Sequence, residues 1–270
     1  MHHSDLAFCP IGIFDSGVGG LTVMRQVMKA LPHEDIVYFG DTARLPYGNK
    51  GQETVMRYCL ENVSFLLEKK VKMVIVACNT ATAFALDHLR QSFSIPILGV
   101  IESGAQKAVE NTKTGCIAVL GTRGTIQSGA YQKALQQADP YLTVVPISCP
   151  LFVPLVEEGM GEHPATEMII REYLRELRDY PVDTILLGCT HYPLLYHQIQ
   201  TIVGNEITLV DSATTCAGKV AELLQYETLM NNQGNSLPQY QYYVSDDPVK
   251  FQELGERVFG HYLEQVGLQV

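Results

Sequence analysis

The chain has 270 residues, of which 46% are hydrophobic and 18% are charged, and its formal charge is −10. This length supports one large core or two domains of ordinary size, and the lack of an apolar run of about 18 residues or more excludes a typical membrane-spanning helix. Because Lys and Arg form no concentrated stripe, the acidic balance argues against nucleic acid or an anionic membrane surface as the main partner.

Short β-branched runs alternate with longer segments of helical period, which predicts βαβ units and parallel sheets. Strands are expected at residues 11–15, 35–40, 73–78, 95–100, 116–121, 142–147, 184–189, 207–211 and 240–244. Helices are expected at residues 19–31, 53–70, 104–112, 125–138, 166–180 and 215–230. The one obvious polar loop is expected at about residues 231–241.

Two segments about a hundred residues apart carry nearly the same pattern. In "VIVACNTATA" and "TILLGCTHYPLL" an apolar strand leads to a cysteine, Cys78 or Cys189, and then to a polar residue and a predicted helix. Gly-rich turns into helices repeat in the same way at residues 12–20 and 118–125. Open α/β sheets bind ligands at the carboxyl ends of their strands. We therefore expect an α/β fold of two similar domains, each with a mainly parallel central sheet flanked by helices, and an active site in the cleft between them.

The two cysteines suit a reaction that moves protons. A free thiol has a pKa of about 8.5, so only a small fraction is thiolate at neutral pH, although the thiolate is a good base and nucleophile. A helix N-terminus stabilises the thiolate, and we expect both Cys78 and Cys189 at strand-to-helix junctions. Two thiols on opposite faces of one bound molecule would remove a proton from one side and return one from the other, which is racemisation or epimerisation.

Six motifs occur in a characteristic order: "IGIFDSGVGGLTV", "YFGDTARLPYG", "ACNTATA", "PLFVPLVEEG", "LGCTHYPLL" and "VDSA". Together they resemble the glutamate racemases of the aspartate/glutamate racemase family. The resemblance implies interconversion of L- and D-glutamate without a cofactor, supplying D-glutamate for peptidoglycan. It also implies a discontinuous first domain, residues 1–98 and 212–270, with the second domain at residues 99–211. A C-terminal strand and helix would complete the first domain.

The resemblance also implies the catalytic residues. Cys78 would take the proton from the D-enantiomer and Cys189 from the L-enantiomer. Asp15 is expected near Cys78, where a carboxylate raises a thiol's pKa, and His191 near Cys189, where a protonated imidazole has the opposite effect. Glu157 is expected on the cleft wall, selected over its neighbour Glu158 by the motif alignment.

Hydroxyls, an amide and backbone N–H groups at helix starts bind anions without a buried Arg or Lys. The family's substrate-binding positions are of this kind, while Asp15 and Glu157 would accept hydrogen bonds from the α-ammonium. In this chain the binding positions correspond to Asp15, Ser16, Tyr47, Gly48, Asn79, Thr80, Thr190 and His191, with Thr122 and Thr125 as additions.

Several alternatives stay open. The chain could act on a shorter acid, as an aspartate racemase, or be a ligand-binding or redox-sensing module whose thiols form a disulfide. Asp15 could simply cap the helix that follows it, and "GVGG" alone is weak evidence for a phosphate loop. The remaining cysteines are interpreted as structural: Cys9, Cys59, Cys116, Cys149 and Cys216.

The cysteine pattern and the N-terminal residues bear on location and partners. Cysteines spread through apolar runs favour reduced thiols in the cytosol, and no Cys/His cluster has zinc-ligand spacing, so no metal is expected. The first residues lack the basic region and long apolar stretch of a secretory signal, so we expect a cytoplasmic protein. The expected partner is a small-molecule substrate, and the family resemblance adds a homodimer.

Overall fold

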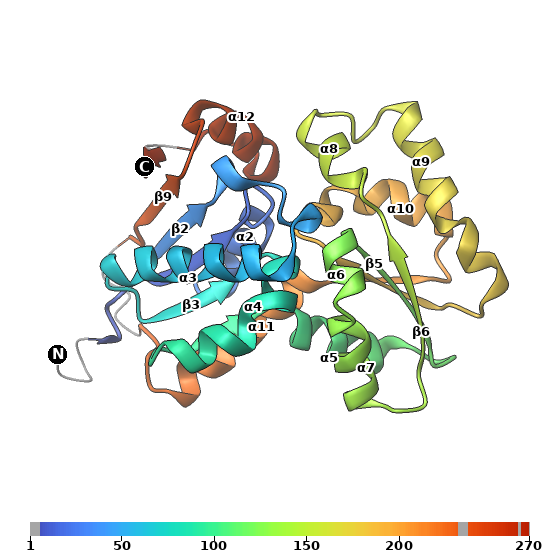
Figure 1. The fold of residues 1–270 in the computed structure, drawn as a ribbon, viewed down its shortest axis with the longest axis horizontal. Coiled ribbons are helices and arrows are strands. Elements are labelled where there is room, and N and C mark those ends of the chain that lie inside the picture. Colours follow the sequence, from blue (N-terminus) through green and yellow to red (C-terminus); the bar gives the residue numbers. More distant parts are fainter. Residues whose placement is uncertain (1–5, 232–236, 264–265, 270) are drawn as a thin grey trace.

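The computed structural model describes residues 6–231, 237–263 and 266–269, and it contains two parallel sheets in two lobes that lie side by side (Figure 1). The first sheet has the strand order β10-β9-β2-β1-β3-β4. Its strands are β1 Ile11–Asp15, β2 Ile36–Gly40, β3 Met73–Val76, β4 Ile97–Gly99, β9 Tyr240–Val244 and β10 Val266–Leu268. The second sheet has the order β6-β5-β7-β8. Its strands are β5 Cys116–Gly121, β6 Thr143–Ser148, β7 Thr184–Gly188 and β8 Thr208–Asp211.

Helices cover both faces of each sheet, which is why the central strands β1 and β5 are buried along their whole length. The helices are α2 Leu21–Ala30, α3 Gln52–Glu68, α4 Asn79–Ser92, α5 Ile101–Asn111, α6 Arg123–Gln127, α7 Ala130–Ala138, α8 Phe152–Glu157, α9 Pro164–Leu174, α10 Tyr196–Val203, α11 Ser212–Tyr226 and α12 Pro248–Phe259. Alternate residues of β1 enter different cores: Ile11 and Ile13 pack with residues of α2 and α11, and Phe14 packs with residues of α3 and α4.

The expected alternation of strands and helices is confirmed, and the differences lie mostly at element ends. The strand expected at residues 73–78 ends at Val76, so Cys78 becomes the N-cap of α4. The helix expected at residues 125–138 is two helices, because Gly129 adopts a left-handed φ of 66° between them. The helix expected at residues 166–180 is α-helical to Leu174 and continues as the 3-10 helix η3 Arg175–Asp179.

No expected element corresponds to α8, to β10 or to the 3-10 helices η1 Thr42–Arg44, η2 Tyr47–Asn49 and η4 Tyr192–Leu195. Each has few residues, so its periodicity is too weak to identify from the sequence. Part of the polar loop expected at residues 231–241, namely residues 232–236, lies outside the described residues.

The chain crosses between the sheets twice. β4 pairs with β3 as far as Gly99, and Val100 still belongs to the core of the first lobe. The return follows β8, after which α11 packs its Ala213, Cys216 and Val220 into that same core. None of the described helices is both long and apolar enough to cross a bilayer.

Candidate active site

Cys78 follows β3, a strand in the middle of the first sheet, at the point where the chain enters α4. It is the N-cap residue of α4, and its carbonyl accepts the Thr82 N–H at 2.8 Å. Cys78 is only 6% exposed, and its thiol lies 3.8 Å from the Ser16 hydroxyl oxygen. The backbone N–H of Ala81 lowers the pKa of this thiol. The expected helix N-terminus is therefore present at this cysteine.

Cys189 occupies the matching place after β7 of the second sheet, but its local structure differs. The next element is the four-residue 3-10 helix η4 Tyr192–Leu195, and α10 begins only at Tyr196. The expectation of an α-helix N-terminus at Cys189 is therefore wrong, because the chain forms the 3-10 turn η4 before α10 begins. The thiol instead lies 4.0 Å from His191 Nδ1.

Asp15, at the end of β1, joins the two junctions. Its Oδ2 accepts the Gly17 N–H at 3.0 Å, and its Oδ1 accepts the Thr190 hydroxyl of the second lobe at 3.3 Å. The Gly-rich turn after Asp15 allows this approach, because a β-carbon on Gly19 would lie 2.4 Å from both Thr190 Oγ1 and His191 Nδ1. The glycine therefore serves contact between the lobes, which accounts for "GVGG" without a phosphate.

His191 is buried between two acidic groups. Its Nδ1 faces the Cys189 thiol, and its Nε2 lies 2.9 Å from Glu157 Oε1 at the end of α8. Burial lowers the pKa of His191, but its hydrogen bonds to Cys189 and Glu157 and their negative charges outweigh this effect and raise the pKa to about 10. These contacts therefore favour the protonated imidazole. Glu157 binds the imidazole rather than standing alone on the wall.

The other thiol has a different electrostatic environment. Burial, the charge of Asp15 and that of Cys189 raise the pKa of Cys78 to about 12, while the Ala81 N–H and the Ser16 hydroxyl act in the opposite direction. The pKa of Asp15 is itself raised by burial, against the charge of His191 and three hydrogen bonds. Asp15 belongs to the first lobe and Cys189 to the second, and the charge of each raises the pKa of Cys78. Groups from both lobes therefore influence the same thiol.

Three threonines form the second contact between the lobes. Thr80 of α4 shares hydrogen bonds with Thr122 at 2.9 Å and Thr125 at 3.0 Å, and these two share another at 3.0 Å. Thr122 is also the N-cap of α6, accepting the Thr125 N–H. Gly48 packs directly against the Thr122 side chain. The expected binding residues of the two lobes therefore meet at this cluster.

Tyr47 is placed differently from the other predicted binding residues. Its side chain is fully buried, and its hydroxyl donates to Asp41 and accepts from Asn62 Nδ2 at 3.0 Å. The hydroxyl is therefore used inside the first lobe. Only the backbone around Tyr47 and Gly48 borders the threonine cluster.

Two buried residues at the lobe boundary were missed by the sequence analysis. The Thr22 hydroxyl of α2 is shared between the Gly19 carbonyl at 2.8 Å and the Thr190 carbonyl at 3.0 Å, and Tyr131 of α7 donates to Asn79 Oδ1 at 2.6 Å. Both lie within helices whose pattern shows only a buried face, so no local signal marks them.

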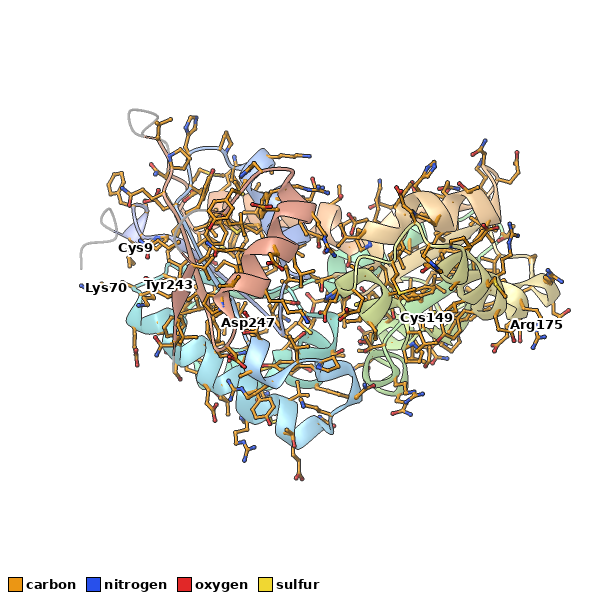
Figure 2. The ribbon with its side chains drawn as sticks, turned by 90° about the horizontal axis from the view of Figure 1, so that it is seen from above. Cys9, Lys70, Cys149, Arg175, Tyr243 and Asp247 are labelled. Atoms are coloured by element: carbon orange, nitrogen blue, oxygen red, sulfur yellow. The ribbon has the colours of Figure 1, made fainter. Side chains whose placement is uncertain are left out.

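The lobes also meet at the outer edge of the site, where α12 and α8 face each other in Figure 1. Arg257 of α12 donates to the Glu157 carbonyl at 3.4 Å, and Lys250 lies 4.0 Å from Glu158. A cavity of about 260 Å³ is lined here by Glu157, Lys250 and Asp247 among others. Figure 2, seen from above, shows Asp247 at this boundary and Cys149 within the second lobe.

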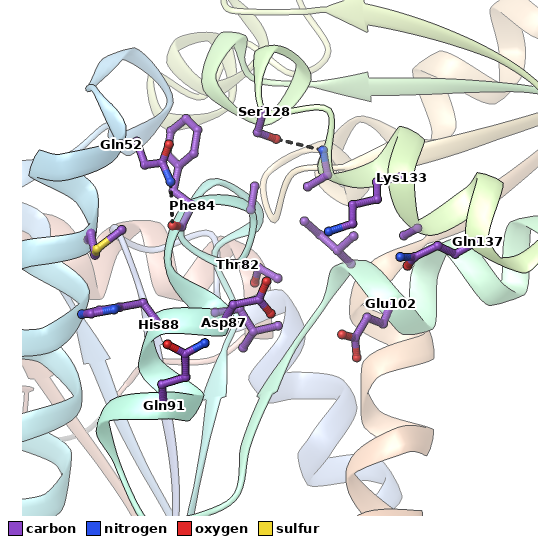
Figure 3. A pocket seen from close by; sticks show the side chains of 16 residues that line it. Gln52, Thr82, Phe84, Asp87, His88, Gln91, Glu102, Ser128, Lys133 and Gln137 are labelled. Carbon is purple, nitrogen blue, oxygen red and sulfur yellow. Dashed lines mark hydrogen bonds between the residues drawn. The ribbon is translucent and has the colours of Figure 1, made fainter.

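A larger polar cavity lies elsewhere on the lobe boundary. It has a volume of about 570 Å³, and its walls come mainly from α4, α5 and α7, with Asp87, Glu102 and Lys133 among the charged lining residues (Figure 3). Neither thiol lines it. The thiol junctions are therefore a separate site from this cavity.

Comparisons with known proteins agree with this arrangement. The family model described as Asp/Glu/Hydantoin racemase matches residues 11–220. The glutamate racemase of Geobacter metallireducens is 51% identical over 259 residues, covering 95% of this chain and 94% of that protein. The crystal structure of glutamate racemase isoform RacE1 from Bacillus anthracis has a TM-score of 0.93 at 38% identity and covers 97% of both chains. That of the Francisella tularensis glutamate racemase in complex with D-glutamate has a TM-score of 0.91 at 35% identity and covers 98% of both. The resemblance carried by the six motifs is thus confirmed, and the chain belongs to the Asp/Glu/hydantoin racemase family.

Proposed function

We propose that this protein interconverts L-glutamate and D-glutamate without a cofactor, using Cys78 and Cys189 as its two acid/base groups. The observation that carries the proposal is the joining of the two cysteine junctions through Asp15, which hydrogen-bonds Thr190 beside Cys189 and whose charge acts on Cys78. The substrate class follows the similar proteins, whose printed names are glutamate racemase.

In the proposed reaction the two thiols alternate roles. Cys78 removes the α-proton of D-glutamate while Cys189 protonates the opposite face, and the reverse reaction starts at Cys189. The charged His191 stabilises a thiolate at Cys189. Glu157 acts through His191, since its Oε1 is already bound to the imidazole. Asp15 accepts a hydrogen bond from the substrate ammonium, and that positive charge offsets the effect of Asp15 on Cys78.

Positioned acid/base groups contribute roughly 10²- to 10⁴-fold, which is not enough for an α-proton beside a carboxylate. As the proton leaves, negative charge grows on the α-carboxylate, so donors aimed there stabilise the transition state more than the ground state. We assign this role to hydroxyls, amides and backbone N–H groups at Ser16, Gly48, Asn79, Thr80, Thr122, Thr125 and Thr190. Tyr47 contributes its backbone, because its hydroxyl binds Asp41 and Asn62.

Incubation of the pure protein with L-glutamate and with L-aspartate in D₂O tests the proposal. We expect α-deuteration, followed by NMR, and loss of optical activity, followed by circular dichroism, for glutamate without added cofactor. A clear preference for aspartate would instead identify an aspartate racemase. No exchange with either acid would contradict a two-thiol racemase.

The cellular role and assembly are further parts of the proposal. D-glutamate made here would enter peptidoglycan, in the cytoplasm, and the protein would act as a homodimer. The buried thiols of Cys59, Cys116, Cys149 and Cys216 are free, which suits a reducing compartment.

We also propose that the lobes are two domains divided near residues 98 and 212. The first crossing lies one or two residues later than 98, because Gly99 and Val100 belong to the first lobe.

A further inference from the structure

One buried side chain, Tyr131 of α7, contacts both thiol junctions. Its hydroxyl donates at 2.6 Å to Oδ1 of Asn79, the residue directly after Cys78. Its ring packs on Gly188, the residue directly before Cys189, so closely that a β-carbon there would lie 2.8 Å from Tyr131 Cε2. Tyr131 is 3% exposed. A single residue of the second lobe therefore touches the backbone beside one thiol and the amide beside the other.

The hydrogen bonds of the Asn79 amide are unequal. Its oxygen accepts from Tyr131, whereas its Nδ2 is buried and has no hydrogen-bond partner within residues 6–231, 237–263 and 266–269. An unpaired buried donor destabilises a protein, so a native site retains one where a ligand satisfies it. Because burial raises the pKa of Tyr131, its hydroxyl keeps its proton and remains a donor.

We propose that Tyr131 is a positioning residue: its hydroxyl fixes the orientation of the Asn79 amide so that Nδ2 donates to a carboxylate of the bound amino acid beside Cys78. This inference rests on the proposed racemisation. Without the hydroxyl the amide can turn over and present its oxygen to the carboxylate, which replaces attraction with repulsion. The effect acts at the reacting end of the substrate, where charge grows during proton removal.

Replacement of Tyr131 by Phe tests this directly. A hydrogen bond to a charged group contributes about 1.5–3 kcal/mol, so we expect kcat to fall roughly 10- to 100-fold in both directions. KM should change little, because the interaction strengthens in the transition state. Tyr192→Phe is the matched control, since the Tyr192 hydroxyl is also buried but donates to the Cys149 carbonyl at 2.8 Å within the second lobe. Its kcat should stay near that of the wild type.

A double-mutant cycle separates positioning from loss of stability. Once Asn79→Ala has removed the amide, adding Tyr131→Phe should cause no further fall in kcat. Additive effects of the two substitutions, or full kcat in Tyr131→Phe, would overturn the inference while leaving racemisation intact. Wild-type protein that does not racemise glutamate would overturn the proposed function and this inference together.

Discussion

The two cysteines end equivalent strands of two similar sheets, but the groups beside them carry opposite charge. Cys78 caps an α-helix and faces the carboxylate of Asp15, and these surroundings raise its pKa to about 12. Cys189 precedes a 3-10 turn and faces His191, whose pKa is raised to about 10 through Cys189 and Glu157. The positive group beside Cys189 is thus His191, a residue of the protein. In the proposed reaction the positive group beside Cys78 is the ammonium of the substrate.

This difference shows how one fold can make two unequal bases serve a reversible reaction. A thiol activated only when substrate binds stays protonated and unreactive in the free protein, and its neighbour keeps a permanent partner. The two halves of the internal repeat therefore place sulfur after equivalent strands and differ in the residue that sets its charge.

Loss of either sulfur should have the largest effect. We expect Cys78→Ser and Cys189→Ser each to lower racemisation by about 10²- to 10⁴-fold, because a hydroxyl is a far weaker acid than a thiol and each turnover uses both groups. Circular dichroism follows the racemisation, and α-deuteration in D₂O follows each proton abstraction. Cys149→Ser is the control, since that buried thiol has no assigned role. Full activity in either variant would refute the two-thiol mechanism.

Removal of the Asp15 charge should weaken substrate binding and lower the pKa of Cys78. In Asp15→Asn we expect KM for both enantiomers to rise roughly 10- to 100-fold, the value of a hydrogen bond to a charged group. The pKa of Cys78 should fall below about 12, because the charge of Asp15 raises it. Ultraviolet absorbance of the thiolate measures this shift by comparison with Asp15→Asn/Cys78→Ser.

Asp211 provides the control for Asp15. It also lies at a strand-to-helix junction, at the end of the edge strand β8, where its carboxylate accepts the Ala213 N–H at 2.8 Å and caps α11. Asp211→Asn should leave KM unchanged. An equal rise in KM in both variants would mean that the carboxylates matter for stability rather than for substrate binding.

Replacement of Glu157 tests the positive charge of His191 beside Cys189. In Glu157→Gln the pKa of His191 should fall from about 10, because the negative charge and its hydrogen bond raise it. A change of about 1.5–3 kcal/mol corresponds to about one or two pKa units. The imidazolium is then lost at lower pH, so the alkaline limb of kcat/KM for L-glutamate should move down by that amount. Glu158→Gln, at an exposed neighbour, should leave the profile unchanged.

The sequence was informative where chemistry repeats at strand ends. The two cysteines, Asp15 and the order of elements follow from hydrophobic periodicity, the internal repeat and the six motifs. Local structure was harder to predict, because the helix expected directly after Cys189 begins as the 3-10 turn η4 and becomes α-helical only at Tyr196. Contacts between lobes, such as those of Thr22 and Tyr131, depend on two segments far apart in the chain meeting in space. The hydrophobic periodicity of one helix therefore does not predict which residue of the other lobe it will contact.

Thr22→Val tests the weakest link between the junctions. The Thr22 hydroxyl is shared between the Gly19 carbonyl of its own lobe and the Thr190 carbonyl of the other, so its loss should cost about 1 kcal/mol in unfolding free energy. Because the backbone between Cys189 and His191 then loses a support, kcat/KM should fall a few-fold more for L-glutamate than for D-glutamate. Thr82→Val is matched to it, since the Thr82 hydroxyl donates to the Val76 carbonyl within the first lobe at 3.0 Å. Equal changes in both directions would show that Thr22 holds the lobes together without distinguishing the two thiols.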